Sequence, residues 1–287
     1  MSQETQARTV TLAELKKYAM HNFKKQRPMF VWGPPGIGKS ETFEQIKQDY
    51  IDQGQTCHLI DARLALWDPT DLKGYPYFDQ TANKMRFSAP DELPDEEMAA
   101  QYDIIILFLD ELNGASPATQ AAAYQLILNR AIGKYKLPDN VVIIAAGNRE
   151  ADKGVTYRMP APLANRFIHI ELAVSFDDWF DWAVDHNQHS DVVGYLQFAK
   201  QDLYDFDPKG ASRSFATPRS WSFVSEILDD NDDENTTTDL VAGCVGEGLA
   251  VKFMAHRKVA GNMPNPSDVL SGKVKELNTQ EITQLLI

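Results

Sequence analysis

The short segment 33-GPPGIGKS-40 constrains the fold of this chain more than any other feature. It lies between an apolar segment at residues 28–32 and a segment with helical periodicity at residues 40–53, so it joins a strand to a helix. Its glycines allow backbone N–H groups to curl around phosphate oxygens, and the following helix directs its positive N-terminus at the same place. The segment therefore predicts a phosphate-binding loop.

The loop fits the pattern G-x-x-x-x-G-K-[ST], which suggests roles for individual side chains. Lys39 would reach the β- and γ-phosphates of a nucleotide, and Ser40 would hold Mg²⁺. A glycine-rich turn with an exposed lysine is the alternative, but chance gives this pattern in only about one chain of this length in a hundred. The residues expected around the nucleotide are Gly33, Pro34, Pro35, Gly36, Ile37, Gly38, Lys39, Ser40 and Glu41.

A second feature, 104-IIILFLDELNG-114, is an apolar run that ends in two adjacent carboxylates. Carboxylates are costly near an apolar core unless a partner offsets the cost. Beside a phosphate loop both have a use, since Asp110 would support Mg²⁺ through water and Glu111 would polarise the attacking water as general base. A strand end that only reaches solvent is the alternative interpretation.

Apolar strands alternate with helical segments in the first part of the chain, which is typical of a parallel α/β sheet flanked by helices. The expected strands are residues 28–32, 58–62, 104–109, 141–146 and 167–172, and the expected helices are 11–25, 40–53 and 117–130. Four later segments read as helices with no strand between them, namely 175–187, 192–204, 221–230 and 240–257. We therefore expect an α/β nucleotide-binding domain over residues 1–174 and a smaller all-helical lid domain over residues 175–287.

Composition limits the setting in which this chain works. No apolar run approaches the roughly 20 residues that a membrane span needs, and MSQETQARTV lacks the apolar core of a signal peptide. Cys57 and Cys244 form no CxxC pair, so a reducing, cytoplasmic location is expected. The formal net charge of −13 argues against a broad nucleic-acid-binding face, although a small basic patch could still exist.

With both motifs in view, residues 10–260 resemble the AAA+ ATPases and, within them, the MoxR-like group. GPPGIGKS resembles the Walker A motif and IIILFLDE the Walker B motif of this P-loop NTPase fold. The segment 141-VVIIAAGN-148 resembles the sensor-1 strand, in which Asn148 would contact the γ-phosphate and help to place the water. A turn or cap residue is the alternative role for Asn148.

Two further segments resemble hairpin insertions of the MoxR-like group, at about residues 74–88 before Walker B and at 129–140 before sensor 1. The first contains aromatic residues at positions 75, 77 and 78. These side chains could contact a substrate if the hairpin projects from the domain, and core packing is the alternative.

The resemblance also implies a ring, expected to be a hexamer, in which one subunit supplies an arginine to the γ-phosphate held by the next. The segment 162-PLANRFIHIEL-172 resembles the one that carries this arginine, so Arg166 is the expected finger. An arginine suits the task because its charge is permanent and its planar fork matches phosphate oxygens. Arg158 and Arg149 are alternatives, and Arg166 could instead form a salt bridge at a domain boundary.

The segment 217-TPRSWSF-223 resembles sensor 2, and Arg219 would then lie near the nucleotide of its own subunit. An exposed arginine at the start of a helix is the alternative.

The resemblance implies Mg²⁺-dependent ATP hydrolysis in an oligomeric ring that drives chaperone-like remodelling of a protein substrate or complex. It also implies a partner with a von Willebrand factor A domain, because MoxR-like proteins are commonly associated with such partners. A nucleic-acid motor or loader is a second hypothesis, for which Lys73, Lys84 and Arg86 near the first hairpin leave room. A third is an ATP-binding switch or scaffold with little turnover, against which the Asp110–Glu111 pair and Arg166 argue.

Overall fold

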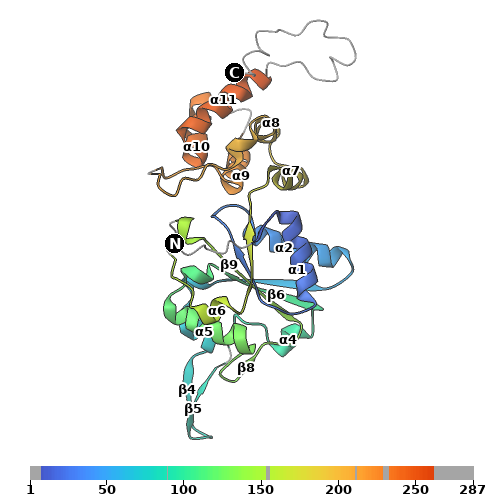
Figure 1. The fold of residues 1–287 in the computed structure, drawn as a ribbon, viewed down its shortest axis with the longest axis vertical. Coiled ribbons are helices and arrows are strands. Elements are labelled where there is room, and N and C mark those ends of the chain that lie inside the picture. The colour runs from blue at the N-terminus through green and yellow to red at the C-terminus, as the bar shows by residue number, and fades with distance from the viewer. Residues whose placement is uncertain (1–7, 89, 153–155, 211, 229–232, 262–287) are drawn as a thin grey trace. The chain divides into compact units, whose positions relative to one another are not determined.

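The structure is a computed structural model that describes residues 8–88, 90–152, 156–210, 212–228 and 233–261. The chain divides into two compact units, Met1–Ser175 and Phe176–Ile287 (Figure 1). Residues 262–287, which the sequence assigns to the helical lid domain, lie outside the described residues. Among the residues that the structure describes, no helix combines the length and the apolar character needed to cross a membrane.

The first unit is built on a six-stranded parallel sheet with the strand order β1-β10-β2-β9-β6-β3. This confirms the expected architecture, a parallel sheet flanked by helices and followed by a helical region. The edge strand β1 was not predicted, because its three residues are too few to show a pattern in the sequence. The strands are β1 (Arg8–Val10), β2 (Met29–Trp32), β3 (Cys57–Arg63), β6 (Ile104–Asp110), β9 (Val141–Gly147) and β10 (Ile168–Leu172).

The two central strands, β6 and β9, are apolar along almost their whole length because helices cover both faces of a parallel sheet. Every residue of β9 is buried, and the five residues 105–109 of β6 have no exposed surface. All parallel strands end at the same edge of the sheet, so the segments that follow β2, β6 and β9 meet there. In register, Trp32 at the end of β2 lies opposite Gly147 at the end of β9.

The helices of the first unit begin where the sequence provides caps. Thr11 caps α1 through a reciprocal capping box with Glu14, and Ser116 caps α5 by accepting a hydrogen bond from the backbone of Thr119. The helices are α1 (Leu12–Phe23), α2 (Lys39–Asp52), α3 (Pro69–Lys73), α4 (Glu96–Ala99), α5 (Pro117–Asn129) and α6 (Ala161–Ala164), with 3₁₀ turns η1 (Leu64–Leu66), η2 (Leu112–Gly114) and η3 (Glu150–Asp152).

Two antiparallel hairpins interrupt the α/β unit. The first pairs β4 (Pro76–Asp79) with β5 (Lys84–Phe87), and the second pairs β7 (Ala131–Ile132) with β8 (Tyr135–Lys136). Figure 1 shows the β4–β5 hairpin extending away from the parallel sheet. The aromatic residues at positions 75, 77 and 78 are 62%, 49% and 55% exposed, so core packing does not account for them.

The second unit is helical, as expected, and Trp221, Phe253 and Tyr195 pack together at its centre. The single helix predicted for residues 240–257 is wrong, because the chain turns at Gly246 with a φ of +95° that L side chains rarely adopt. The helices are α7 (Phe176–Asp185), α8 (Ser190–Phe198), α9 (Pro218–Ile227), α10 (Glu234–Val245) and α11 (Glu247–Gly261), with the 3₁₀ turn η4 (Lys200–Leu203).

Candidate functional site

The candidate site is formed where β2, β6 and β9 end. The loop after β2 turns through Gly36 and Gly38, whose φ angles of +76° and +89° are left-handed and favour glycine. Gly38 then precedes α2, which begins at Lys39, so the N-terminal N–H groups of this helix follow directly from the loop. This arrangement of a loop and a helix start is suited to an anion.

Lys39 connects this loop to the end of β9. Its ammonium group donates hydrogen bonds to the carbonyl oxygens of Gly33, at 2.7 Å, and Pro34, at 2.9 Å. It also lies 3.3 Å from Oδ1 of Asn148, the residue that follows β9. The positive charge is therefore held inside the loop and next to Asn148, as a phosphate-binding role for Lys39 requires.

Ser40 and Asp110 come together between α2 and β6. The Ser40 hydroxyl donates to Oδ2 of Asp110 at 3.2 Å. A hydroxyl and a carboxylate oxygen side by side fit Mg²⁺, which takes one or two protein oxygens and fills its remaining positions with water and phosphate oxygens. The donor set is thus compatible with the metal that the sequence implies.

Asp61 on β3 adds negative charge near the same position. Burial, and next the charge of Asp110, raise the pKa of Asp61 above its ordinary value. Arg63, which pairs in register with Asp110, offsets part of this effect, and its Nε lies 3.7 Å from Asp61 Oδ2. A cation bound beside Asp110 would relieve the repulsion between the two carboxylates. No sequence motif marks Asp61 for this role, because it lies inside an ordinary strand pattern.

Glu111 has an unusual backbone conformation. Its φ of +52° is left-handed, which costs on the order of 1–3 kcal/mol in a residue other than glycine. The turn persists because the Glu111 N–H donates to Asp110 Oδ1 at 2.8 Å and because Leu112, which follows, is fully buried. The result is an exposed Glu111 carboxylate on a rigid support.

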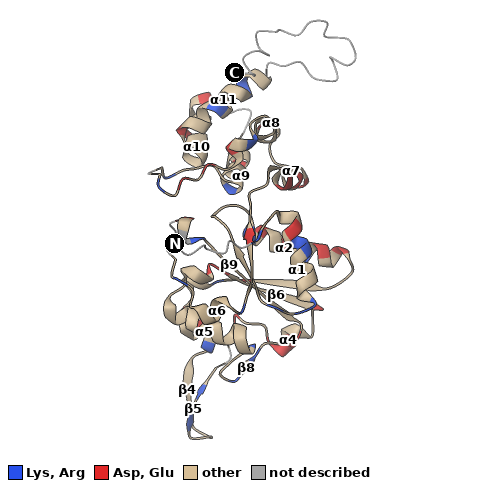
Figure 2. Ribbon diagram, in the orientation of Figure 1, with Lys and Arg blue, Asp and Glu red and all other residues tan. Residues whose placement is uncertain are grey.

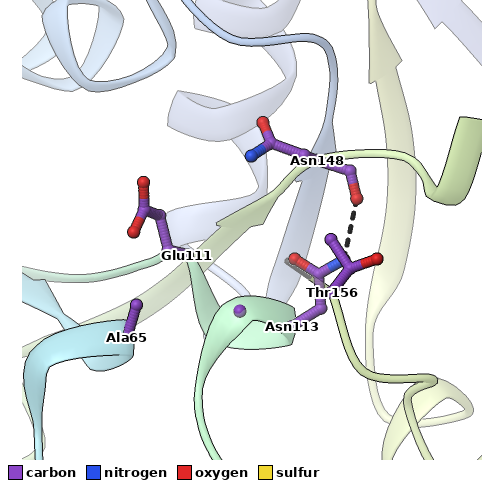
Figure 3. Close-up of a pocket in the computed structure, with 6 residues that line it drawn as sticks. Ala65, Glu111, Asn113, Asn148 and Thr156 are labelled. Atoms are coloured by element: carbon purple, nitrogen blue, oxygen red, sulfur yellow. Dashed lines mark hydrogen bonds between the residues drawn. The ribbon is translucent and has the colours of Figure 1, made fainter. Parts of the chain in front are cut away.

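A cavity of about 310 Å³ lies beside Glu111 (Figure 3). Figure 3 shows Glu111, Asn113 and Asn148 around it, contributed by the turn after β6 and by the end of β9. The structure therefore brings together the loop with Lys39 and Ser40, both carboxylates and Asn148. The remaining lining residues are Ala65, Gly114 and Thr156.

Asn113 and Gly147 were missed by the sequence analysis. The side-chain amide of Asn113 donates to the backbone oxygen of Asn148 at 2.7 Å. A Cβ atom on Gly147 would come within 2.1 Å of Asn113 Oδ1, so only glycine allows this close approach. Both residues are close in sequence to the motifs, since Asn113 lies two residues after Glu111 in DELNG and Gly147 directly precedes Asn148 in AAGN. This proximity is the signal that could have identified them.

The candidate arginines differ in their surroundings. Arg149 forms ion pairs with Asp152, at 2.9 Å, and Glu171, at 2.7 Å, and the hydrogen bond to Asp152 is the main cause of its raised pKa. Arg149 is thereby engaged within its own subunit, which disfavours it as a finger for a neighbour. The other three expected arginines, Arg158, Arg166 and Arg219, are exposed, and Arg219 lies in the second unit near the start of α9.

A histidine that the sequence analysis did not single out links β2 to α6. The Trp32 indole donates to His169 Nδ1 at 2.9 Å, so a neutral His169 ring carries its proton on Nε2. His169 Nε2 then donates to the carbonyl oxygen of Ala164 at 2.8 Å. Trp32 immediately precedes the phosphate loop and Ala164 ends α6, two residues before Arg166.

Comparison with known proteins gives one family match. A profile described as "ATPase family associated with various cellular activities (AAA)" matches residues 29–172, about half of the chain. This match begins at β2 and ends at β10, so it spans the loop, both carboxylates and Asn148. A search of curated proteins gave no match.

Solved structures with a similar fold include a candidate ATPase from Cytophaga hutchinsonii, at 13% identity over 97% of this chain and 89% of that one, with a TM-score of 0.44. NtrX from Brucella abortus is 14% identical over 98% of this chain and 61% of that one, with a TM-score of 0.46. A RuvB variant from Thermotoga maritima is 16% identical over 92% of this chain and 76% of that one, with a TM-score of 0.42.

Replacing Lys39 by alanine should weaken nucleotide binding. A hydrogen bond to a charged group contributes about 1.5–3 kcal/mol, so we expect the Kd for ATP to rise about tenfold to a hundredfold. Titration of a fluorescent ATP analogue measures the change. Lys47→Ala is the matched control, because Lys47 lies on the same helix but pairs with Glu44. Equal affinities of the Lys39→Ala and wild-type proteins would contradict the role given to this lysine.

Proposed function

Because the chain belongs to the AAA family, whose profile matches residues 29–172, we propose that it hydrolyses ATP with Mg²⁺ in an oligomeric ring. The observation that carries this proposal is the meeting of five side chains at one edge of the sheet, each of a type that phosphoryl transfer to water requires. They are Lys39, Ser40, Asp110, Glu111 and Asn148.

Each of these residues has a part in the proposed reaction. Lys39 and the N–H groups of the loop would hold the phosphates, and Ser40 and Asp110 would hold Mg²⁺, which would supply positive charge that stabilises the negative charge of the phosphates. Asn148 places the attacking water, and Glu111 accepts a proton from it as its oxygen bonds to the γ-phosphorus. The bond from that phosphorus to the bridging oxygen breaks, giving ADP and phosphate. Fixed positions and charge complementarity supply the catalysis.

The proposed ring, with six subunits expected, would complete each site with an arginine from the neighbouring subunit. Arg166 is favoured because it is exposed directly after α6, where another molecule can reach it. Arg158 is also exposed and remains the alternative, whereas Arg149 is tied to two carboxylates of its own subunit. Arg219 on α9 is proposed as the sensor-2 residue of the lid domain, residues 175–287.

Within the AAA family we propose a MoxR-like protein that remodels a protein substrate with a partner containing a von Willebrand factor A domain. The β4–β5 hairpin supports contact with a protein. Its register puts Phe78 opposite Met85 and Pro76 opposite Phe87, so four apolar residues share one face. Phe78, Met85 and Phe87 are 55–59% exposed, and an exposed apolar face of this kind usually marks an interaction site.

A nucleic-acid motor is the second candidate, because the hairpin also carries basic residues (Figure 2). Residues 176–287 contain 19 Asp and Glu against nine Lys and Arg, so they hold −10 of the chain's net charge of −13. The first unit is therefore nearly balanced, and its charge does not oppose a local nucleic-acid contact. Arg86, however, pairs with Asp79 on the same face, which leaves few unpaired charges there and favours the protein substrate.

Glu111→Gln should separate ATP binding from ATP hydrolysis. The amide keeps the shape of the side chain but accepts no proton, so turnover should fall by about a hundredfold or more while ATP affinity stays the same. Phosphate release and nucleotide titration measure the two properties. Glu44→Gln on α2 is the control for loss of an exposed carboxylate. A wild-type protein that binds ATP and does not hydrolyse it would favour the switch or scaffold hypothesis instead.

Arg166→Ala should retain ATP binding and lower turnover by about 10³-fold, the least that an arginine finger typically contributes. Mixing inactive Arg166→Ala and Lys39→Ala subunits should restore part of the activity, because a site formed between them can have both residues intact. Phosphate release from the mixture measures this rescue. If Arg158→Ala gives this behaviour and Arg166→Ala remains fully active, Arg158 is the finger.

The hairpin hypothesis predicts which polymer stimulates turnover. Casein, used as an unfolded protein, should raise the ATPase rate, and Phe78→Ser combined with Phe87→Ser should abolish this effect and leave the basal rate unchanged. Lys84→Ala, on the opposite face, should respond to casein normally. Stimulation by single-stranded DNA that falls steeply with salt and is lost in Lys84→Ala would support the nucleic-acid motor instead.

A further inference from the structure

Asn113 is a polar side chain in an almost completely buried position. Only 2% of its surface is exposed, and it lies two residues after Glu111 in the turn η2. We propose that Asn113 is a positioning residue for ATP hydrolysis, which holds the Asn148 peptide in place relative to Glu111. This inference rests on the proposed ATPase function and adds to it a residue that does not touch the substrate.

The side chain of Asn113 fixes one side of Asn148. Its Nδ2 donates to the Asn148 backbone oxygen at 2.7 Å, across 35 residues of sequence. The Asn148 side chain, on the other side, lies 3.3 Å from the Lys39 ammonium group. Without the first bond the Asn148 peptide could rotate, and the side-chain amide would move away from Lys39 and from the phosphate that Lys39 binds.

The close approach of Asn113 to Gly147 strengthens this restraint. A Cβ on Gly147 would lie 2.1 Å from Asn113 Oδ1 and 2.8 Å from the Phe30 ring, so the end of β9 has little space to shift. The Gly147 carbonyl oxygen also accepts a hydrogen bond from Gly33 N–H at 3.3 Å. Asn113 therefore packs against the same peptide unit that contacts the phosphate loop.

The main chain of Asn113 reaches a third segment. Its carbonyl oxygen accepts a hydrogen bond from the Tyr157 N–H at 2.7 Å. Residues 157–163 lead from there into α6. Asn113 thus joins the turn that carries Glu111, the end of β9 and the segment before α6.

Only the donor half of the Asn113 amide has a partner among the described residues. Oδ1 is buried and accepts no hydrogen bond from them, which costs about 1–3 kcal/mol. An apolar side chain of similar shape would avoid this cost. The bond from this amide to the Asn148 backbone oxygen therefore explains why an amide stands at position 113. We infer that the position of Asn148, at the end of β9, is what the function requires.

The test compares Asn113→Ala with Asn140→Ala. Asn140 is the matched control because its side chain also bridges backbone oxygens, those of Ala99 and Tyr102, but at the opposite end of β9. Asn113→Ala should lower kcat by about tenfold or more, with KM for ATP and Kd for a fluorescent ADP analogue changed less than about twofold. Asn140→Ala should lower the unfolding temperature and leave kcat close to that of the wild type.

Asn113→Asp adds a second measurement, the pH dependence of kcat relative to the wild type. A purely structural role of Asn113 would not change this dependence. The introduced carboxyl would be buried, two residues after Glu111 in the chain, and burial and nearby negative charge both raise the pKa of a carboxyl group. Ionised, it cannot donate to Asn148, whereas protonated it can. The kcat of Asn113→Asp, divided by that of the wild type, should therefore rise as pH falls from about 8 to 6. At the acidic end this ratio should exceed the corresponding ratio for Asn113→Ala, which should not change with pH.

The outcomes separate this inference from the proposed function. Wild-type protein without ATPase activity would overturn the proposed function and the inference with it. An active wild type with unchanged kcat in Asn113→Ala would overturn the inference alone. A loss of kcat in Asn140→Ala equal to that in Asn113→Ala would also overturn it, as would an Asn113→Asp ratio that does not depend on pH. If Asn113→Ala does not fold, the pH ratio of Asn113→Asp decides.

Discussion

The site depends first on the parallel pairing of β2 with β9. The register sets Trp32 opposite Gly147, so the phosphate loop starts at the same level at which β9 ends. The hydrogen bond from Gly33 N–H to the Gly147 oxygen continues this pairing one residue into the loop. Lys39 can reach Asn148 only because these two chain segments leave the sheet side by side. A shift of one residue would turn the alternating side chains to opposite faces and separate the two groups.

The charges of the site explain why such a rigid support is needed. Asp61 and Asp110 bring like charges close together, and the raised pKa of Asp61 results from its burial and from the charge of Asp110. Arg63, whose Nε lies 3.7 Å from Asp61 Oδ2, offsets part of this effect. The left-handed backbone of Glu111 adds a further cost. The buried strands β6 and β9 supply the stability that tolerates these costs, and a bound cation would reduce them.

The sequence was informative where the pattern is local. The phosphate loop and the apolar run that ends in two carboxylates could be predicted because each needs only adjacent residues of defined chemistry. Contacts between residues that are distant in sequence could not be predicted in this way. Asn113 and Asn148 are 35 residues apart, and Trp32 and His169 are 137 residues apart. The break at Gly246 was missed for another reason, because a glycine within an amphipathic pattern is compatible with a continuous helix and with a turn. Local chemistry thus points to the candidate reacting groups, whereas the contacts of Asn113 and His169 required the fold.

Two hydrogen-bonded connections run from the phosphate site to the segment that contains the exposed arginines. One passes from Trp32 through His169 to Ala164, and the other passes from Asn113 to the Tyr157 N–H. The segment that includes Arg158 and leads to Arg166 is therefore held at both ends by residues adjacent to the nucleotide motifs. A displacement of the loop or of the turn after β6 would be transmitted to this segment through bonds rather than through flexible chain. The segment with the exposed Arg158 and Arg166 is thus linked to the ends of β2 and β6 by hydrogen bonds within the same subunit.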